Sequence, residues 1–253
     1  MNVHPEGRSE PSDPALRTGA APVTDHSAEN AQRAYARLAG GMYLLLLVVD
    51  IAGVLITSSV AGAGSFGDIS QQILASETLY RIGLCCGLVG SLVTILLAIG
   101  LYVTVKPVDG NLALMALLFR VVEAAIGAIG TILAFNVLQI HLAASHANAF
   151  DANQLGALAT FSSGVGTDVG AIFFSVGSTI FFYLLLRSRY IPRLLSAWGI
   201  FASLVYLVVW FVSLILPQYA GTAVAVGSVP ILLAELSTGF WLLLVGIKAP
   251  LRA

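Results

Sequence analysis

Four ionisable residues lie deep inside long apolar stretches of the sequence: Asp50, Arg120, Glu123 and Glu235. A charged side chain in the hydrocarbon core of a membrane costs about 2.5–3.5 kcal/mol even on the most lenient insertion scale. Residues that bear this cost commonly line ion or proton pathways. We therefore treat these four as a candidate intramembrane polar cluster.

The acids of this cluster fall at similar depths. Asp50, Glu123 and Glu235 each lie twelve or thirteen residues from a polar or basic residue that marks one end of the apolar segment. At about 1.5 Å per residue the separations are about 18–20 Å, close to mid-membrane, and Arg120 lies at about 14 Å. The helical rise therefore predicts that these groups can meet.

The charges of the cluster do not balance. Arg120 and Glu123 are three residues apart and share a helix face, which Gly127 and Gly130 continue, so this face is predicted to point into the bundle. Three acids against one base leave at least one acid without a cationic partner, and such an acid is a candidate proton carrier or cation ligand. The alternative is structural: Arg120 pairs with Glu123, and the other acids form hydrogen bonds between helices.

A second charged pair lies outside the apolar stretches. Glu77 and Arg81 are four residues apart behind Ser76. This spacing predicts an ion pair in the first turns of a helix at the outer membrane interface, with Ser76 as the helix N-cap.

Metal-binding and catalytic signatures are weak. His141 and His146 are five residues apart, which places them on different helix faces with no evident third ligand. The adjacent Cys85 and Cys86 lie within an apolar run and are interpreted as packing residues. The sequence contains no H-E-x-x-H or G-x-S-x-G motif, so we predict no catalytic residue, no metal site and no cofactor.

The elements that position these residues are transmembrane helices. Of the 253 residues, 58% are hydrophobic and 10% are charged, against about 25% charged residues in an ordinary soluble domain. The apolar segments are long enough to cross about 30 Å of hydrocarbon and lack the alternation of barrel strands. The predicted fold class is all-α, a six-helix transmembrane bundle, with segments at approximately 38–58, 82–105, 112–140, 169–186, 194–216 and 229–247.

Small residues and prolines indicate how the segments pack and where they end. Gly83, Gly87 and Gly90 form a stripe on the second segment, which predicts close packing within the bundle. Prolines are predicted to lie at segment ends, where they cost a helix least; they are Pro107, Pro192, Pro217 and Pro230.

Basic residues predict the orientation. They precede the first segment, follow the sixth and occupy the second and fourth connections, whereas the third and fifth connections have neither Lys nor Arg. By the positive-inside rule both termini are cytoplasmic and the protein is a multipass protein of the cell (plasma) membrane. Residues 1–32, rich in Pro, Ser and Ala, are predicted to form a disordered cytoplasmic tail before a transmembrane domain over residues 33–253.

The sequence also resembles a known family over residues 33–248, in chain order. The stretches that carry the resemblance are Arg37-Leu-Ala-Gly-Gly with Tyr43, Ala75-Ser-Glu77 with Arg81-Ile-Gly83, Leu101-Tyr102 with Lys106-Pro107, Leu112-Ala-Leu with Leu118-Phe-Arg120-Val-Val-Glu123-Ala, Arg187-Ser with Tyr190-Ile-Pro192, and Glu235-Leu with Trp241-Leu-Leu. They are similar to a membrane family designated domain of unknown function 4386. The resemblance implies a bacterial or archaeal multipass protein and supplies no activity, substrate or site.

Three classes of function follow. The scarcity of catalytic signatures favours a non-catalytic membrane scaffold, accessory subunit or stress-related component. One alternative is a permease or channel-like protein that uses the carboxyl cluster to handle cations or protons; another is an intramembrane enzyme. The lipid bilayer is the expected partner, together with an unidentified protein, small ion or solute. A net charge of -1 argues against nucleic acid.

Overall fold

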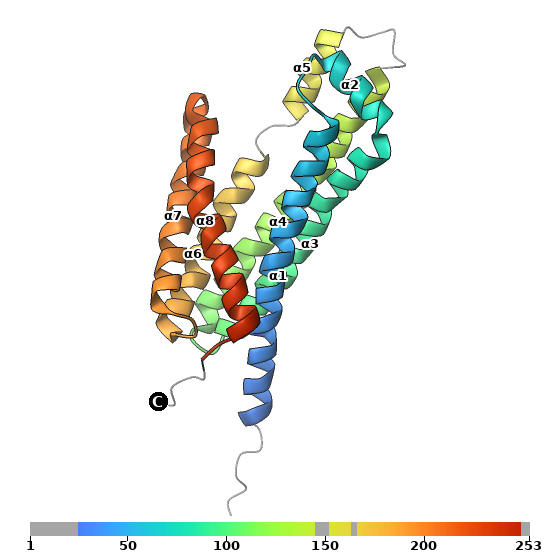
Figure 1. Cartoon of the computed structure of the whole chain (residues 1–253). Helices are drawn as coiled ribbons and strands as arrows, with labels where there is room; N and C mark the ends of the chain where they lie inside the picture. Colours follow the sequence, from blue (N-terminus) through green and yellow to red (C-terminus); the bar gives the residue numbers. More distant parts are fainter. Residues whose placement is uncertain (1–24, 145–151, 163–165, 249–253) are drawn as a thin grey trace, which may run out of the picture.

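The structure is a computed structural model that describes residues 25–144, 152–162 and 166–248 (Figure 1). Six of its helices are long and apolar enough to cross a membrane. This confirms the predicted all-α, six-helix transmembrane class. The spanning helices are α1 (Asp25–Val60), α3 (Glu77–Val105), α4 (Gly110–Ala144), α6 (Gly166–Ser188), α7 (Arg193–Ile215) and α8 (Ala220–Phe240), the last continued by the π-helical turn η3 (Trp241–Val245).

The two ends of the bundle differ (Figure 1). The short helices α2 (Phe66–Ala75) and α5 (Ala152–Ser162) lie together at one end, which we call the α2 end. The start of α1 and the end of η3 lie at the opposite end, which we call the terminal end. The 3₁₀ turn η2 (Pro217–Tyr219) joins α7 to α8.

The N-terminus of α2 is capped by side chains. The hydroxyl of Ser65 accepts a hydrogen bond from the Asp68 amide, and the Asp68 carboxylate accepts one from the Ser65 amide, which forms a capping box. His141 of α4 contacts α2 through two residues. Its Nδ1 lies 2.8 Å from the Ser70 hydroxyl oxygen, and its ring stacks on the Phe66 ring with centroids 4.6 Å apart. These contacts fasten α2 to the end of α4.

Helix α1 begins earlier than the sequence predicted. Residues 25–32, assigned above to the disordered tail, form its first two turns. The side chain of Gln32 is buried, and its Nε2 donates hydrogen bonds to the Thr104 carbonyl at 2.6 Å and the Tyr190 hydroxyl at 3.1 Å. The polar composition of residues 25–32 gave no indication of these hydrogen bonds, because their partners lie far away in the sequence. Residues 1–24 of the predicted tail lie outside the described residues.

The prediction that all four prolines lie at helix ends is wrong for Pro230. This residue lies inside α8, five residues before Glu235. Proline in a helix leaves the carbonyl one turn earlier without its helical hydrogen bond, so it weakens α8 locally. Pro192 and Pro217 do lie at the starts of α7 and η2.

The terminal half of the bundle is tightly packed. Helices α1 and α8 cross so closely that a Cβ on Gly40 would lie 2.8 Å from the Gly239 carbonyl oxygen. A Cβ on Gly100 of α3 would likewise lie 3.1 Å from that of Ala39 on α1. The side chains that fill this half are 0–1% exposed; they include Ala36, Ala39, Leu97, Leu101, Ala113 and Phe181. The bundle is therefore closed at the terminal end.

The half nearer the α2 end is looser. Figure 1 shows α7 and α8 leaning away from α1, α3 and α4 toward this end. Helices α1 and α3 remain in contact there, since a Cβ on Gly83 would lie 2.8 Å from Cγ2 of Thr57. The divergence therefore separates one group of helices from another and leaves room between them.

Candidate functional site: an acidic cavity in the bundle

A cavity of about 770 Å³ lies between the diverging helices. Its lining comes from residues 46–57 of α1, 80–94 of α3 and 123–137 of α4, together with positions on α6, α7 and α8. Most of these stretches lie in the part of each helix nearer the α2 end, whereas Ile231 and Glu235 lie in the half of α8 that leads to the terminal end, where the closed half begins. It is thus a blind pocket that reaches the middle of the bundle from the α2 end.

The wall of this cavity is acidic. Asp50, Glu123 and Glu235 all line it, and none of the described residues that line it is Lys, Arg or His. The structure therefore brings together at one cavity three acids that come from three different helices.

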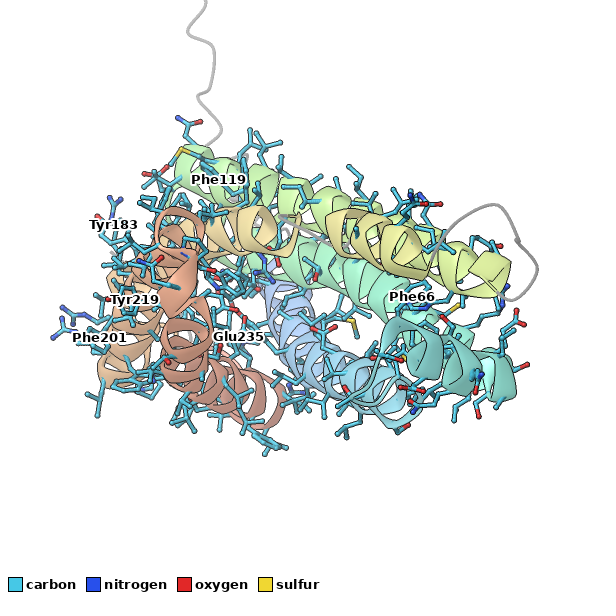
Figure 2. The ribbon with its side chains drawn as sticks, turned by 90° about the horizontal axis from the view of Figure 1, so that it is seen from above. Phe66, Phe119, Tyr183, Phe201, Tyr219 and Glu235 are labelled. Carbon is cyan, nitrogen blue, oxygen red and sulfur yellow. The ribbon has the colours of Figure 1, made fainter. Side chains whose placement is uncertain are left out.

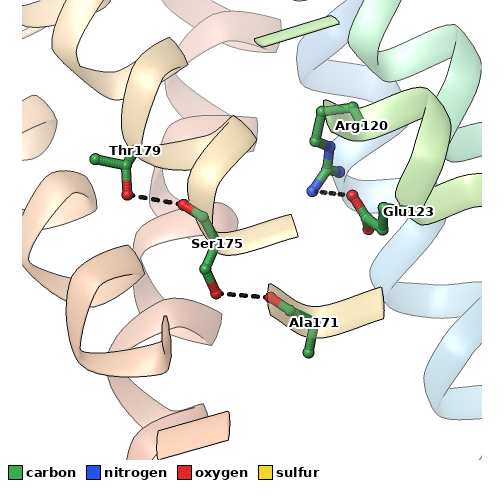
Figure 3. Close-up of polar contacts among 5 residues, drawn as sticks. All are labelled: Arg120, Glu123, Ala171, Ser175 and Thr179. Atoms are coloured by element: carbon green, nitrogen blue, oxygen red, sulfur yellow. Dashed lines mark hydrogen bonds and ion pairs between the residues drawn. The ribbon is translucent and has the colours of Figure 1, made fainter. Parts of the chain in front are cut away.

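Arg120 lies behind the wall and faces Glu123 (Figure 3). Its Nη1 is 3.0 Å from a carboxylate oxygen of Glu123, which makes a close ion pair, although these atoms are not aligned for a hydrogen bond. Arg120 is only 1% exposed. Its guanidinium carbon lies 4.6 Å from the centre of the Phe174 ring, and its aliphatic stem packs on Gly177, where a Cβ would come within 3.1 Å.

Helix α6 thus offers Arg120 an aromatic face and a glycine, and its nearby hydroxyl groups are engaged elsewhere. The Ser175 hydroxyl donates to the Ala171 carbonyl and the Thr179 hydroxyl to the Ser175 carbonyl, each at 2.7 Å (Figure 3). The guanidinium group makes no hydrogen bond with any described residue. Glu123 is therefore its principal electrostatic partner.

Glu235 is the most enclosed of the three acids. Figure 2 shows it between α8 and α1, and it is 8% exposed. Its Oε1 is buried without a hydrogen-bond partner among the described residues, and no described basic side chain lies within ion-pair distance of it. One turn along α8, Gly239 packs against Tyr43 of α1. Glu235 therefore presents an unpaired carboxyl group at the closed floor of the cavity.

Asp50 lies on the α1 side of the cavity and is exposed. Its carboxylate rests on the backbone of α3, because a Cβ on Gly90 would lie 2.6 Å from its Oδ1. The glycine stripe predicted on the second segment thus packs against α1 at Gly83 and Gly90, whereas Gly87 faces the cavity near Thr131 of α4.

Aromatic residues complete the wall, and sequence reasoning missed them. Phe174, Tyr206 and Trp210 line the cavity. The Tyr206 ring lies between the other two and contacts both in edge geometry, with ring centroids 5.5 Å from Phe174 and 5.6 Å from Trp210. The available signal was a stripe of small and polar residues on α7, at three- and four-residue spacing, which shares its face with Tyr206 and Trp210; its members are Ser196, Gly199, Ser203 and Ser213.

The other candidate residues lie outside the cavity. Glu77 and Arg81 form an ion pair at 2.7 Å at the start of α3, but Ser76 makes no side-chain capping bond there. His141 serves the α2 contact already described, and His146 lies outside the described residues. Among the described residues, no group of three His, Cys, Asp or Glu side chains could hold a metal ion. Cys85 and Cys86 are free.

Comparison with known proteins adds a family and no activity. The family described as domain of unknown function (DUF4386) matches residues 38–246. The chain belongs to this family. The match includes every acid of the cavity and Arg120, and it confirms the resemblance noted from the sequence. No match was found among curated proteins or among solved structures.

Proposed function

We propose that the protein is a permease or channel-like membrane protein that handles cations or protons through the carboxyl groups of its cavity. One observation carries the proposal: Asp50, Glu123 and Glu235 line a single blind cavity with no basic described residue in its wall. In their ionised form these groups are carboxylates, which create a negative potential in a low-dielectric cleft, and this potential attracts cations and repels anions.

The shape of the cavity supports transport more than static packing. A pocket that reaches mid-membrane from one side and stops at a packed layer is the arrangement expected of one state in an alternating-access cycle. Gly40, Gly239 and Gly100 let the helix backbones of the packed layer approach closely, which closes the pocket on this side.

The basic residues support an orientation. Four basic residues lie toward the terminal end: Arg33 and Arg37 in the N-terminal part of α1, Lys106 at the C-cap of α3, and Arg187 in the last turn of α6. The positive-inside rule then places this end in the cytoplasm, so both termini are cytoplasmic and the cavity faces the outside of the cell membrane.

Charge movement across a reconstituted membrane tests this function. Purified protein in liposomes on a solid-supported electrode is exposed to steps of protons, Na⁺, K⁺, tetramethylammonium and tetraphenylphosphonium. We expect a protein-dependent current with at least one of these cations and its loss in Glu235→Gln and Glu123→Gln. The matched control is Glu29→Gln, which removes a carboxylate 4.0 Å from Arg33 near the start of α1, far from the cavity. Unchanged currents in both cavity variants, or no current with any cation, would contradict the proposal.

The non-catalytic scaffold favoured by the sequence is the second candidate. The observation in its favour is the fully buried Arg120, which links α4 to α6 through Phe174 and Gly177 and gives the charged pair a packing role. Under this function Glu123→Gln lowers the melting temperature but changes no current, and crosslinking recovers one defined protein partner. Cation-driven current from the purified protein alone would count against it.

A further inference from the structure

The cavity wall contains aromatic side chains as well as carboxyl groups. We propose that the cavity binds a bulky organic cation that carries aromatic or alkyl groups, in preference to a bare inorganic ion. The inference rests on the proposed function and names the class of its substrate.

The acids are too dispersed to coordinate a bare ion. A divalent cation needs about six oxygen ligands at about 2.0–2.6 Å. Among the described residues, no cluster of His, Cys, Asp and Glu side chains could hold a metal ion, although three acids line the cavity. Acids that share a cavity without converging on one point suit a ligand whose positive charge is spread over a large group.

Glu235 is the anchor for that charge. Glu123 already faces Arg120 at 3.0 Å, and Asp50 lies on the exposed side of the cavity. Glu235 is 8% exposed, with an unpartnered Oε1 and no described basic neighbour within ion-pair distance. A cation that reaches the floor of the cavity therefore meets a buried carboxyl group that has no competing partner.

The aromatic wall supplies the apolar part of the site. Arg120 already occupies the face of Phe174, whereas Tyr206 and Trp210 line the cavity with no described cation over their rings. Tyrosine and tryptophan rings attract organic cations through their negative faces. The volume of about 770 Å³ lies within the range typical of sites for drug-sized ligands.

One glycine makes the cavity testable by steric filling. Gly130 of α4 lines the cavity, and a Cβ added there would meet nothing within 4 Å. A larger side chain at this position therefore begins in open space, and we expect a leucine to take up part of the ligand space. Gly221 at the start of α8 also has nothing within 4 Å, but it does not line the cavity, so Gly221→Leu is the matched control.

Equilibrium dialysis of tetraphenylphosphonium against the purified full-length protein in detergent tests the proposal, with empty micelles as background. We expect saturable binding that Glu235→Gln weakens about tenfold or more, because removal of one partner from a buried charge pair is costly. Trp210→Leu should weaken it about two- to thirtyfold. Gly130→Leu should weaken it as well, and Glu29→Gln and Gly221→Leu should leave it unchanged.

Two competition experiments distinguish recognition of an organic cation from hydrophobic binding of a neutral compound and from binding of an inorganic ion. Triphenylphosphine oxide presents similar phenyl groups without a positive charge, so it should compete poorly. Excess Na⁺ or Mg²⁺ should also compete poorly, because neither has groups that contact Tyr206 and Trp210. Equal binding of the neutral compound, or binding that neither Glu235→Gln nor Gly130→Leu weakens, would overturn the proposal. If Glu235→Gln fails to fold, Gly130→Leu decides the outcome.

The failure of this inference can be told apart from failure of the proposed function. Currents driven only by protons, Na⁺ or K⁺, without tetraphenylphosphonium binding, would refute the organic-cation site and leave cation handling intact. The absence of both binding and current would refute both.

Discussion

The crossing of α1 and α8 is the contact on which closure of the terminal end depends, and a pair of adjacent glycines can test it. A Cβ on Gly40 would lie 2.8 Å from the Gly239 carbonyl oxygen and 2.9 Å from the Leu242 carbonyl carbon, and closer still to the Leu243 amide nitrogen. A Cβ on Gly41 would meet only the Leu243 side chain, at 3.9 Å. Gly40→Ala should therefore disturb the crossing, and Gly41→Ala should not.

The magnitude follows from what surrounds the added methyl group. All three atoms nearest to a Cβ on Gly40 belong to the backbone and cannot rotate away, so the helices must separate by roughly 0.5–1 Å, and overpacking of this kind costs about 1–3 kcal/mol. Both substitutions gain about the same helix propensity, at most about 1 kcal/mol. The difference between them therefore isolates the contact and should amount to a melting temperature about 2–12 °C lower for Gly40→Ala.

Thermal unfolding followed by size-exclusion chromatography with fluorescence detection measures this difference in detergent. Gly41→Ala should melt at or slightly above the temperature of the unmodified protein. If Gly40→Ala melted as high as Gly41→Ala, the close approach of α1 to α8 would be refuted, and the closed end of the cavity with it.

Three further predictions concern polar contacts. Arg120→Met leaves Glu123 buried without its partner and should lower the free energy of unfolding, measured by chemical denaturation, by about 3–5 kcal/mol. The double variant Arg120→Met with Glu123→Gln should recover most of this loss, and an equal loss in the single and double variants would argue against the ion pair. Hydrogen bonds from Ser65 hold the pKa of the Asp68 carboxyl below its usual range. Protection of α2 amides from hydrogen exchange should therefore hold above the ordinary carboxyl pKa and fall as pH drops through the lowered one, and Asp68→Asn should remove this dependence. Gln32→Ala removes two hydrogen bonds and should cost about 1–3 kcal/mol in the same denaturation assay, and an unchanged value would contradict the anchoring of α1.

The helices and the depth of the acids could be predicted because both depend on local quantities. Segment length against membrane thickness gave the spanning helices, and the helical rise put Asp50, Glu123 and Glu235 at a common level. Chain composition could not give the start of α1, because Gln32 is held by partners 72 and 158 residues away in the sequence.

The cavity itself was beyond the reach of the sequence. Its width comes from the divergence of α7 and α8 from the other helices, which depends on tertiary packing and not on any segment alone (Figure 1). Tyr206 and Trp210 became part of the wall only through that geometry. The position of Pro230 within α8 was missed for a related reason: membrane helices tolerate proline where neighbouring groups compensate for the lost hydrogen bond.

Access of water to the cavity from one face is the central claim, and two-sided thiol labelling tests it most directly. Cys85 and Cys86 are replaced by alanine, a single cysteine is introduced by Asp50→Cys in the cavity wall, and Leu97→Cys in the closed half, where the side chain is 0% exposed, is the control. A membrane-impermeant maleimide is applied to each face of oriented vesicles. We expect rapid modification of Asp50→Cys from the face that carries α2, slow modification from the other face, and none of Leu97→Cys from either. If the folded Asp50→Cys protein resisted modification from both faces, the cavity would be dry and the account of cation handling would be wrong.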